Sequence, residues 1–212
     1  MPGPEGPLDD GVLIEILEEA RDLGFLGPGA VVDHIDHAAA FLAMLDTVPE
    51  GRSLDLGSGG GVPGLMLAKA RPSAEWVLLD ASSRRTAFLT RAVAALGLAP
   101  RVHVVTGRAE ELARRKDHRG SYQLVVARSF ARPAVVAECA APVLAVGGAL
   151  VVSEPPGGEA TSRWSEDGLQ ELGLRVVESA RDPRHLVRLH QERPCPERFP
   201  RRVGVPSKRP LW

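Results

Sequence analysis

A glycine-rich loop between a strand and a helix constrains the fold of this chain more than any other feature. Residues 53–64 read SLDLGSGGGVPG, so that Gly57, Gly59 and Gly61 stand at every second position. The acid Asp55 ends the predicted strand just before these glycines. Glycines allow a sharp turn and a close approach of a ligand to the backbone, and the following helix offers free N–H groups to an anion. The stretch therefore predicts a nucleotide-binding loop.

The middle of the chain alternates between short apolar runs and helical patterns. The expected strands are 53–56, 76–79, 102–105, 124–127 and 149–152, and the expected helices are 63–70, 83–96, 108–112 and 133–144. Apolar strands in a βα rhythm are typical of a parallel sheet that helices cover on both faces. Right-handed crossovers make such a sheet doubly wound. We therefore expect an α/β fold with a mostly parallel, doubly wound, Rossmann-like sheet.

Both ends of the chain extend this core. Apolar residues at helical spacing predict helices over 12–23 and 31–45, which form a small helical cap within residues 1–50. The nucleotide-binding domain then takes residues 51–192, and a basic tail takes residues 193–212. Inside the domain we expect a charged, solvated stretch at 114–121, a loop at 155–158, a helix at 161–172, and a terminal hairpin of strands 175–179 and 185–190 with one antiparallel strand.

Asp55 decides between two nucleotide cofactors. A dehydrogenase loop needs the pattern G-x-G-x-x-G, which fails from Gly57 because Val62 takes the last position, and which starts late if counted from Gly59. A carboxylate there suits a pyrophosphate poorly, but it suits the ammonium group of S-adenosylmethionine (SAM). Asp80 ends the second strand about 20 residues after the loop, where an acid binds the ribose hydroxyls of either cofactor. The pattern favours SAM, and an NAD-dependent oxidoreductase is the alternative.

Charge and composition limit the partners of the chain. The formal net charge is −1, so no overall basic surface indicates nucleic-acid binding. The tail is locally basic, however, and we expect Arg201, Arg202 and Lys208 on an extended arm that contacts RNA. The two cysteines lack metal-ligand spacing, and we expect no metal. No signal peptide or membrane-spanning run is evident, so we expect a cytoplasmic monomer.

Residues 55–65, DLGSGGGVPGL, resemble the signature of the small-subunit (16S) ribosomal RNA guanine-N7 methyltransferases, the glucose-inhibited division protein B family. Further stretches agree with that family at 70–72, 78–89, 107–111, 127–131 and 199–211. The resemblance covers about residues 50–150 and the tail. It implies a class I SAM-dependent methyltransferase that acts on N7 of a guanine, with ribosomal RNA or the 30S subunit as its partner.

The resemblance also implies roles for particular residues. Gly57 and Val62 line the cofactor loop, and Asp80 lies at the ribose. The full expected cofactor set is Asp55, Gly57, Ser58, Gly59, Gly61, Val62, Asp80, Ala81, Ala109, Glu110 and Arg128, with Ala109 and Glu110 at the adenine. Arg128, the expected catalytic residue, reaches the cofactor or the substrate, unless it only pairs with a neighbouring acid. Arg84 and Arg108 fall where the family has functional basic residues facing RNA.

Two stretches differ from the family, and both lie on the substrate side. The family begins with a longer helical segment and an Arg-His pair, whereas this chain reads DHIDH at 33–37. His34 and His37 with Asp33 and Asp36 imitate a metal cluster, but a solvated helix face is favoured. After the fifth strand the family has Lys-Gly, and here Glu154 replaces that positive charge with a negative one. A methyltransferase of a small molecule or another RNA, and a SAM-binding protein without catalysis, therefore stay as alternatives.

Overall fold

Seven strands form one sheet in the computed structural model, which describes residues 11–155, 163–181 and 184–212. The strands are β1 (Ser53–Leu56), β2 (Trp76–Asp80), β3 (Val102–Thr106), β4 (Tyr122–Ala127), β5 (Leu144–Ser153), β6 (Leu174–Ala180) and β7 (Leu186–Gln191). Their order across the sheet is β3-β2-β1-β4-β5-β7-β6. The order reverses between β1 and β4, and open α/β sheets bind ligands at the carboxyl ends of the strands beside such a reversal.

The strand pairings confirm the predicted sheet. β1 runs parallel to β2 and β4, and the pairs β2–β3 and β4–β5 are also parallel. β7 is antiparallel to both β5 and β6, so the terminal hairpin brings in one antiparallel strand, as expected. Because β1 to β5 run in one direction, their carboxyl ends meet at a single edge of the sheet.

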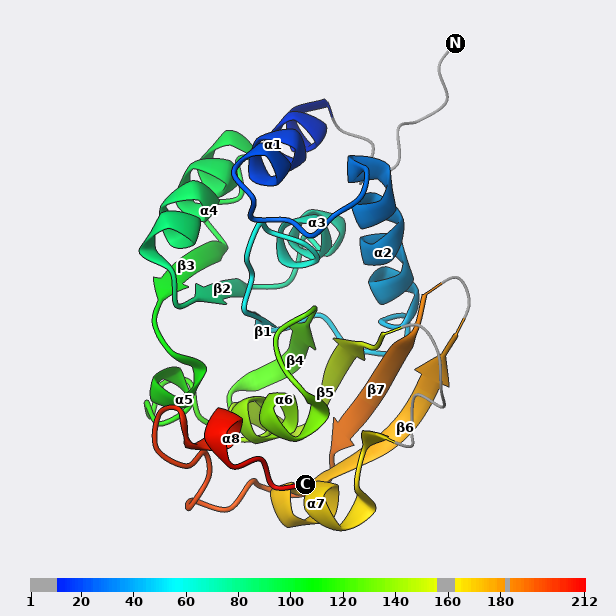
Figure 1. Ribbon diagram of the computed structural model, residues 1–212, viewed down its shortest axis with the longest axis vertical. Helices are drawn as coiled ribbons and strands as arrows, with labels where there is room; N and C mark the ends of the chain where they lie inside the picture. Colours follow the sequence, from blue (N-terminus) through cyan, green and yellow to red (C-terminus); the bar gives the residue numbers. More distant parts are fainter. Residues whose placement is uncertain (1–10, 156–162, 182–183) are drawn as a thin grey trace.

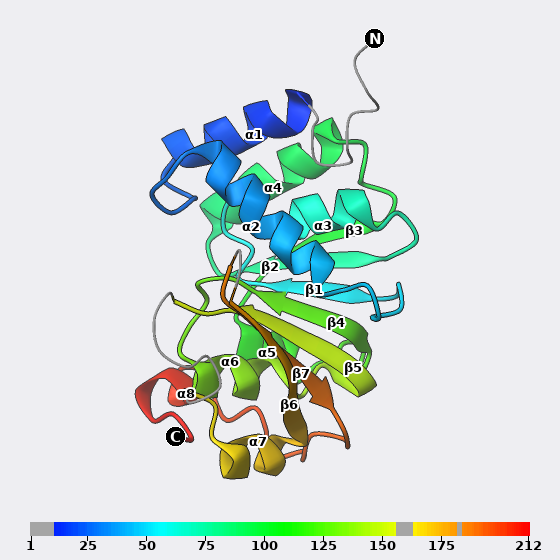
Figure 2. The ribbon, with the colours of Figure 1, turned by 90° about the vertical axis from the view of Figure 1, so that its right-hand side faces the viewer.

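Helices cover both faces of the sheet (Figures 1 and 2). They are α1 (Gly11–Asp22), α2 (Val31–Ala43), α3 (Gly64–Ala70), α4 (Ser83–Ala95), α5 (Ala109–Leu112), α6 (Pro133–Ala140), α7 (Glu166–Leu172) and α8 (Val205–Lys208). Figure 2 shows α1 to α4 on one side and α5 to α8 on the other. Side chains alternate along β2: Trp76 and Leu78 pack with the first layer, and Val77 and Leu79 pack with the second. Both faces of the sheet are therefore core, which explains the continuous apolar runs.

The two N-terminal helices pack directly on the glycine loop. Leu13 and Leu17 of α1 share a buried cluster with Val31 of α2. Val62 of the loop and Met66 of α3 belong to the same cluster. The helical cap therefore supports the loop from the side opposite to the sheet.

The predicted start of the fifth strand is wrong, and the reason lies at a pair of glycines. We expected Gly147 and Gly148 to precede the fifth strand, but β5 begins at Leu144 and α6 ends earlier, at Ala140. A Cβ on Gly148 would lie 2.9 Å from the Tyr122 carbonyl oxygen, so only glycine lets the two strands approach there. The pairing of β4 with β5 shifts register at this point, as at a β-bulge. Most of the expected loop at 155–158 and the start of the helix expected at 161–172 lie outside the described residues.

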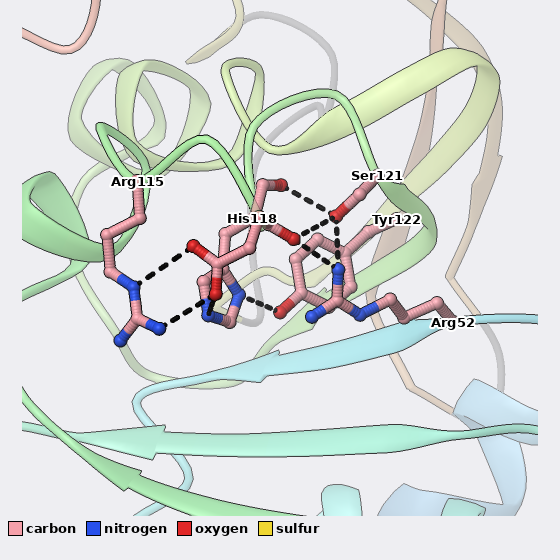
Figure 3. Close-up of polar contacts among 6 residues, drawn as sticks. Arg52, Arg115, His118, Ser121 and Tyr122 are labelled. Carbon is pink, nitrogen blue, oxygen red and sulfur yellow. Dashed lines mark hydrogen bonds and ion pairs between the residues drawn. The ribbon is translucent and has the colours of Figure 1, made fainter.

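The charged stretch at 114–121 is only partly solvated, because His118 is buried at the amino end of β4 (Figure 3). Its Nδ1 lies 2.5 Å from the Tyr122 hydroxyl. Arg52 donates to the Ser121 hydroxyl at 2.7 Å and to the Asp117 carbonyl at 2.5 Å. Burial lowers the pKa of His118 and raises that of Tyr122 to about 12, so both groups are neutral at pH 7. This network joins β1 to β4 at the edge opposite to the nucleotide loop.

Replacing Tyr122→Phe tests the structural role of this network. The change removes the hydroxyl that satisfies the buried His118 ring, so we expect a loss of about 1–3 kcal/mol in the free energy of unfolding. Chemical denaturation measures it. The control Arg115→Ala removes an exposed ion pair to Asp117 and is expected to cost less than about 1 kcal/mol. Equal losses in the two variants would contradict the assignment.

Candidate functional site

The carboxylate of Asp55, near the end of β1, holds the nucleotide loop in place. This side chain is 1 % exposed, and its Oδ2 accepts a hydrogen bond from the Gly64 amide at 3.1 Å, at the start of α3. A Cβ on Gly64 would collide with Asp55 Oδ2, so glycine is required there. Ser58 donates its hydroxyl to the Asp55 carbonyl at 3.0 Å. The loop thus wraps around the end of β1 and leaves β1 tied to α3.

Asp80 ties the same loop to the neighbouring strand. Its Oδ2 accepts from the Gly59 amide at 3.0 Å, and its Oδ1 accepts from the Ser82 amide at 2.8 Å. Arg85 at the start of α4 places a guanidinium nitrogen 3.6 Å from Oδ2. A carboxylate offers about four acceptor positions. Asp80 therefore has acceptor positions left for hydrogen bonds from a ligand.

A cavity of about 220 Å³ opens at the carboxyl ends of β1 to β4, and its lining brings together six of the expected site residues. These are Gly57, Asp80, Ala81, Arg108, Ala109 and Glu110. The lining is completed by Leu79, Arg85, Gly107, Ser129 and Phe130, which the expected site did not include. Gly57 has φ of 80°, and a Cβ there would lie 2.6 Å from the Phe130 ring. Glycine at position 57 therefore keeps the floor of this cavity open.

Other expected cofactor residues belong to the loop without lining this cavity. Ser58, Gly59 and Gly61 shape the turn, whereas the side chain of Val62 is buried against α1 and α2. Arg84 and Arg85 both lie over the ring of Phe25, at 5.8 and 6.0 Å from its centroid, but of the two it is Arg85 that lines the cavity. The two arginines are adjacent, and only the rotation of α4 distinguishes them.

Arg128, at the end of β4, is held by the N-terminal cap. Its Nη2 donates to His34 Nδ1 at 2.6 Å, which leaves His34 Nε2 to donate to the Gly27 carbonyl at 3.2 Å. Burial, with the nearby Arg128 charge, lowers the pKa of His34, so the ring is a neutral acceptor. The expected solvated face of this helix is therefore wrong for His34, which is buried. Its signal in the sequence was the unusual DHIDH stretch.

A second cavity of about 350 Å³ shares Ser129 and Phe130 with the first. The remaining lining residues are His37, Ala131, Val152, Ser153, Glu154, Pro155 and Arg163. Burial, with Arg128 close by, lowers the pKa of His37 to about 4, so this ring is neutral at pH 7. Its Nε2 is buried and has no hydrogen-bond partner among the described residues. Ser129 has φ of 53°, a strained value for serine that is typical of functional sites.

Glu154 does not present a free negative charge to this second cavity. Its carboxylate forms an ion pair with Arg163 and accepts from Trp164 Nε1 at 3.1 Å. Burial raises the pKa of Glu154, and the Arg163 charge opposes that rise. The negative residue expected at this position is present, but Arg163 pairs with it, so the second cavity meets an ion pair rather than an uncompensated negative charge.

The basic tail does not extend as an arm. Arg201 donates to Glu138, a side chain of α6 that is 0 % exposed, and Phe199 of the tail is buried. The expected extended arm is wrong, and Arg201 has a structural partner. Arg202 and Lys208 are exposed.

Among the described residues, no cluster of three or more His, Cys, Asp or Glu side chains is arranged to hold a metal ion. None of their helices has the length and apolar character needed to cross a bilayer.

Comparison with known proteins identifies the family. Residues 28–159 match the family of rRNA small subunit methyltransferase G. The sequence is 37 % identical to the ribosomal RNA small subunit methyltransferase G of Moorella thermoacetica over 84 % of this chain and 76 % of that protein. It is 36 % identical to the same enzyme of Rubrobacter xylanophilus over 94 % of this chain and 80 % of that protein. The chain belongs to this methyltransferase family.

The match confirms the resemblance drawn from the glycine loop, and with it a methyltransferase that uses SAM. It begins at residue 28 and so includes α2, which the sequence reasoning placed outside the resemblance. The SAM-dependent O-methyltransferase of Thermotoga maritima has the same fold, with a TM-score of 0.57 and 16 % identity over 83 % of this chain and 71 % of that one.

Replacing Gly57→Ala tests the first cavity. The new methyl group would meet the Phe130 ring at a positive φ, so we expect the affinity for SAM to fall at least about tenfold. Isothermal titration calorimetry measures this affinity. Gly97→Ala is the matched control, since Gly97 also has a positive φ, 66°, but faces open space. If both variants bound SAM like the wild type, the cavity would not be the cofactor site.

The buried Asp55 makes stability depend on pH. Burial raises its pKa from 3.8 to about 7, so the folded state holds a proton that the unfolded state releases above pH 4. The contribution of protonated Asp55 to the stability of the folded state is therefore complete below about pH 4, and it is lost as the pH rises to about 7. We expect the unfolding free energy of the wild type minus that of Asp55→Asn to decrease between about pH 4 and about pH 7. Urea denaturation at a series of pH values measures it. A constant difference would contradict the raised pKa.

Proposed function

We propose that this protein transfers the methyl group of SAM to N7 of a guanine in small-subunit ribosomal RNA. The observation that carries the proposal is the meeting of two cavities at Ser129 and Phe130, in a chain that belongs to the rRNA small subunit methyltransferase G family. One cavity suits the methyl donor, and the other suits a flipped-out base.

The first cavity suits SAM because its acids match the donor groups of that molecule. Asp80 and Glu110 offer carboxylate oxygens to ribose hydroxyls and to the amino group of adenine. Asp55 Oδ1 is buried and has no hydrogen-bond partner among the described residues, which favours a cationic ammonium nearby. When bound, SAM supplies an electrophilic methyl group on a positively charged sulfur.

The chain needs to position the acceptor rather than activate it. Guanine N7 carries a free lone pair, so no residue has to remove a proton before methyl transfer. Phe130 provides a ring on which a base stacks, and the neutral His37 and the Glu154–Arg163 pair provide polar contacts in the lining of the second cavity. Holding two reactants in line supplies a large part of such a rate enhancement. Arg128, fixed by His34, is the charged group placed closest in sequence to the junction at Ser129.

Exposed arginines near the two cavities suit a phosphate backbone. Arg84, Arg108 and Arg132 are exposed at the starts of α4, α5 and α6, and all three helices begin at the carboxyl edge of the sheet. Such side chains contact phosphates and make binding dependent on salt. Arg202 and Lys208 are additional candidates. This substrate places the proposed activity in the cytoplasm, where we propose a monomer that acts on the 30S particle or its RNA.

Transfer of a labelled methyl group tests this function. Purified protein is incubated with labelled SAM and either 30S particles or naked 16S RNA, and the modified base is identified by mass spectrometry. We expect 7-methylguanosine at one position. Label in a small molecule alone, another modified base, or tight NAD binding without SAM binding would contradict the proposal.

Arg128→Met tests the positioning role of that guanidinium. We expect the rate of methyl transfer to fall about a hundredfold, because misplacement of the reactants has effects of that size. The control Arg91→Met removes an exposed arginine that pairs with Glu19 on the surface, and its rate is expected to match the wild type. An unchanged rate in Arg128→Met would remove Arg128 from the proposed mechanism.

A further inference from the structure

The tail that follows β7 packs along the helical layer formed by α5, α6 and α7 (Figure 1). Arg119 donates hydrogen bonds to three tail carbonyls, those of Cys195, Pro196 and Phe199. Arg114 donates to the Pro200 carbonyl at 2.5 Å. These contacts bring the tail from the far end of the sheet toward α5, which carries one wall of the cofactor cavity.

A buried ion pair fixes the tail at this point. Glu138 accepts from the amide and the Nε of Arg201, both at 2.8 Å, and from Nη2 at 2.5 Å. The same Nη2 donates to the Arg209 carbonyl at 2.7 Å, so it also closes the turn that contains α8. Two-pronged arginine–carboxylate pairs of this kind have a defined geometry. The backbone between Arg201 and Arg209 is therefore held in one place.

Gly204, inside that turn, contacts a residue that lines the cofactor cavity. Its amide donates to Glu110 Oε1 at 2.9 Å, and Glu110 lines the cavity. Gly204 has φ of 78°, a conformation that suits glycine and aims its amide at the carboxylate. Burial opposes ionisation of Glu110, but the Gly204 amide, the residue's own amide and Arg108 together lower its pKa. Glu110 is therefore an ionised acceptor at pH 7.

Glu110 needs such a support because its own helix is short. α5 has four residues, and an isolated helix of that length is unstable. The side chain of Arg108 also contacts Glu110, but it is 3.5 Å away and about half exposed, so that ion pair contributes little. The amide of Gly204 is the shorter and less exposed contact.

We propose that the tail segment 201–209 is part of the cofactor site: through the Gly204 amide it positions Glu110 to accept a hydrogen bond from the adenine amino group of SAM. This inference rests on the proposed placement of the adenine beside Glu110. Gly204 and Arg201 are positioning residues, since they act through Glu110. The tail then determines which base the cofactor cavity accepts.

A pair of ligands that differ at the amino group tests the proposal. S-adenosylhomocysteine carries the adenine amino group, and S-inosylhomocysteine carries a carbonyl oxygen in its place. Calorimetry gives the affinity of the full chain for each ligand. The affinity for S-adenosylhomocysteine divided by that for S-inosylhomocysteine is the ratio that measures recognition of the amino group. A purely structural defect would weaken both ligands and leave the ratio unchanged.

Gly204→Pro removes the amide donor, because proline has no N–H, and it also moves the local backbone, because proline cannot adopt the φ of 78° found at Gly204. We expect the ratio to fall about tenfold, as for the loss of one hydrogen bond to a charged group. Glu110→Gln is expected to lower it similarly, and the double variant to fall no further than either single one. Arg198→Ala, which removes an exposed tail ion pair with Glu171, is the control and keeps the wild-type ratio.

An unchanged ratio in Gly204→Pro, or additive losses in the double variant, would overturn the inference. Should Gly204→Pro not fold, glycolic acid at position 204, installed by ligating a synthetic tail at Cys195, applies the same test, because the ester removes only the N–H and keeps the glycine conformation. A lower ratio supports the proposal and an unchanged one overturns it. If the wild type bound neither ligand, the proposed cofactor placement would fail instead.

Discussion

The hydrogen bond between the Gly64 amide and the buried Asp55 carboxylate organises the carboxyl edge of this protein. It fixes where β1 ends and where α3 begins, and the loop between them can then take only one path. That path places the Gly59 amide on Asp80, which joins β1 to β2. Burying a carboxylate is costly, which is why its pKa rises to about 7. The nearby charge of Arg128 offsets part of this cost.

Local sequence patterns predicted much of the fold and six of the residues that line the first cavity. The apolar runs and the glycine loop predicted the parallel strands, and strand-end positions predicted Asp80. These features depend on neighbours close in the chain. The rotation of a helix decided between Arg84 and Arg85, and a pattern of single residues does not resolve that rotation. The bulge at Gly148 depends on the facing strand β4, which the local sequence pattern does not show. The predicted start of β5 was therefore wrong.

Contacts between distant parts of the chain escaped prediction. His34 and Arg128 are 94 residues apart in sequence, and neither position alone indicates the other. A histidine on an amphipathic helix reads as solvated until the helix is placed on the end of β4. The same holds for Glu154, whose charge is balanced by Arg163. The second cavity is thus lined by residues from α2, β5 and the segment after β4, whereas the first cavity is lined by consecutive βα units.

The contact of Gly204 with Glu110 has a consequence for biosynthesis. Gly204 also follows its partner by 94 residues. A growing chain that has completed β4 already contains the glycine loop, Asp80 and Glu110, yet it lacks the amide that donates to this last carboxylate. Synthesis therefore passes through a stage in which β1 to β4 are present while this contact cannot form. The contact forms only after the chain has been translated beyond Gly204.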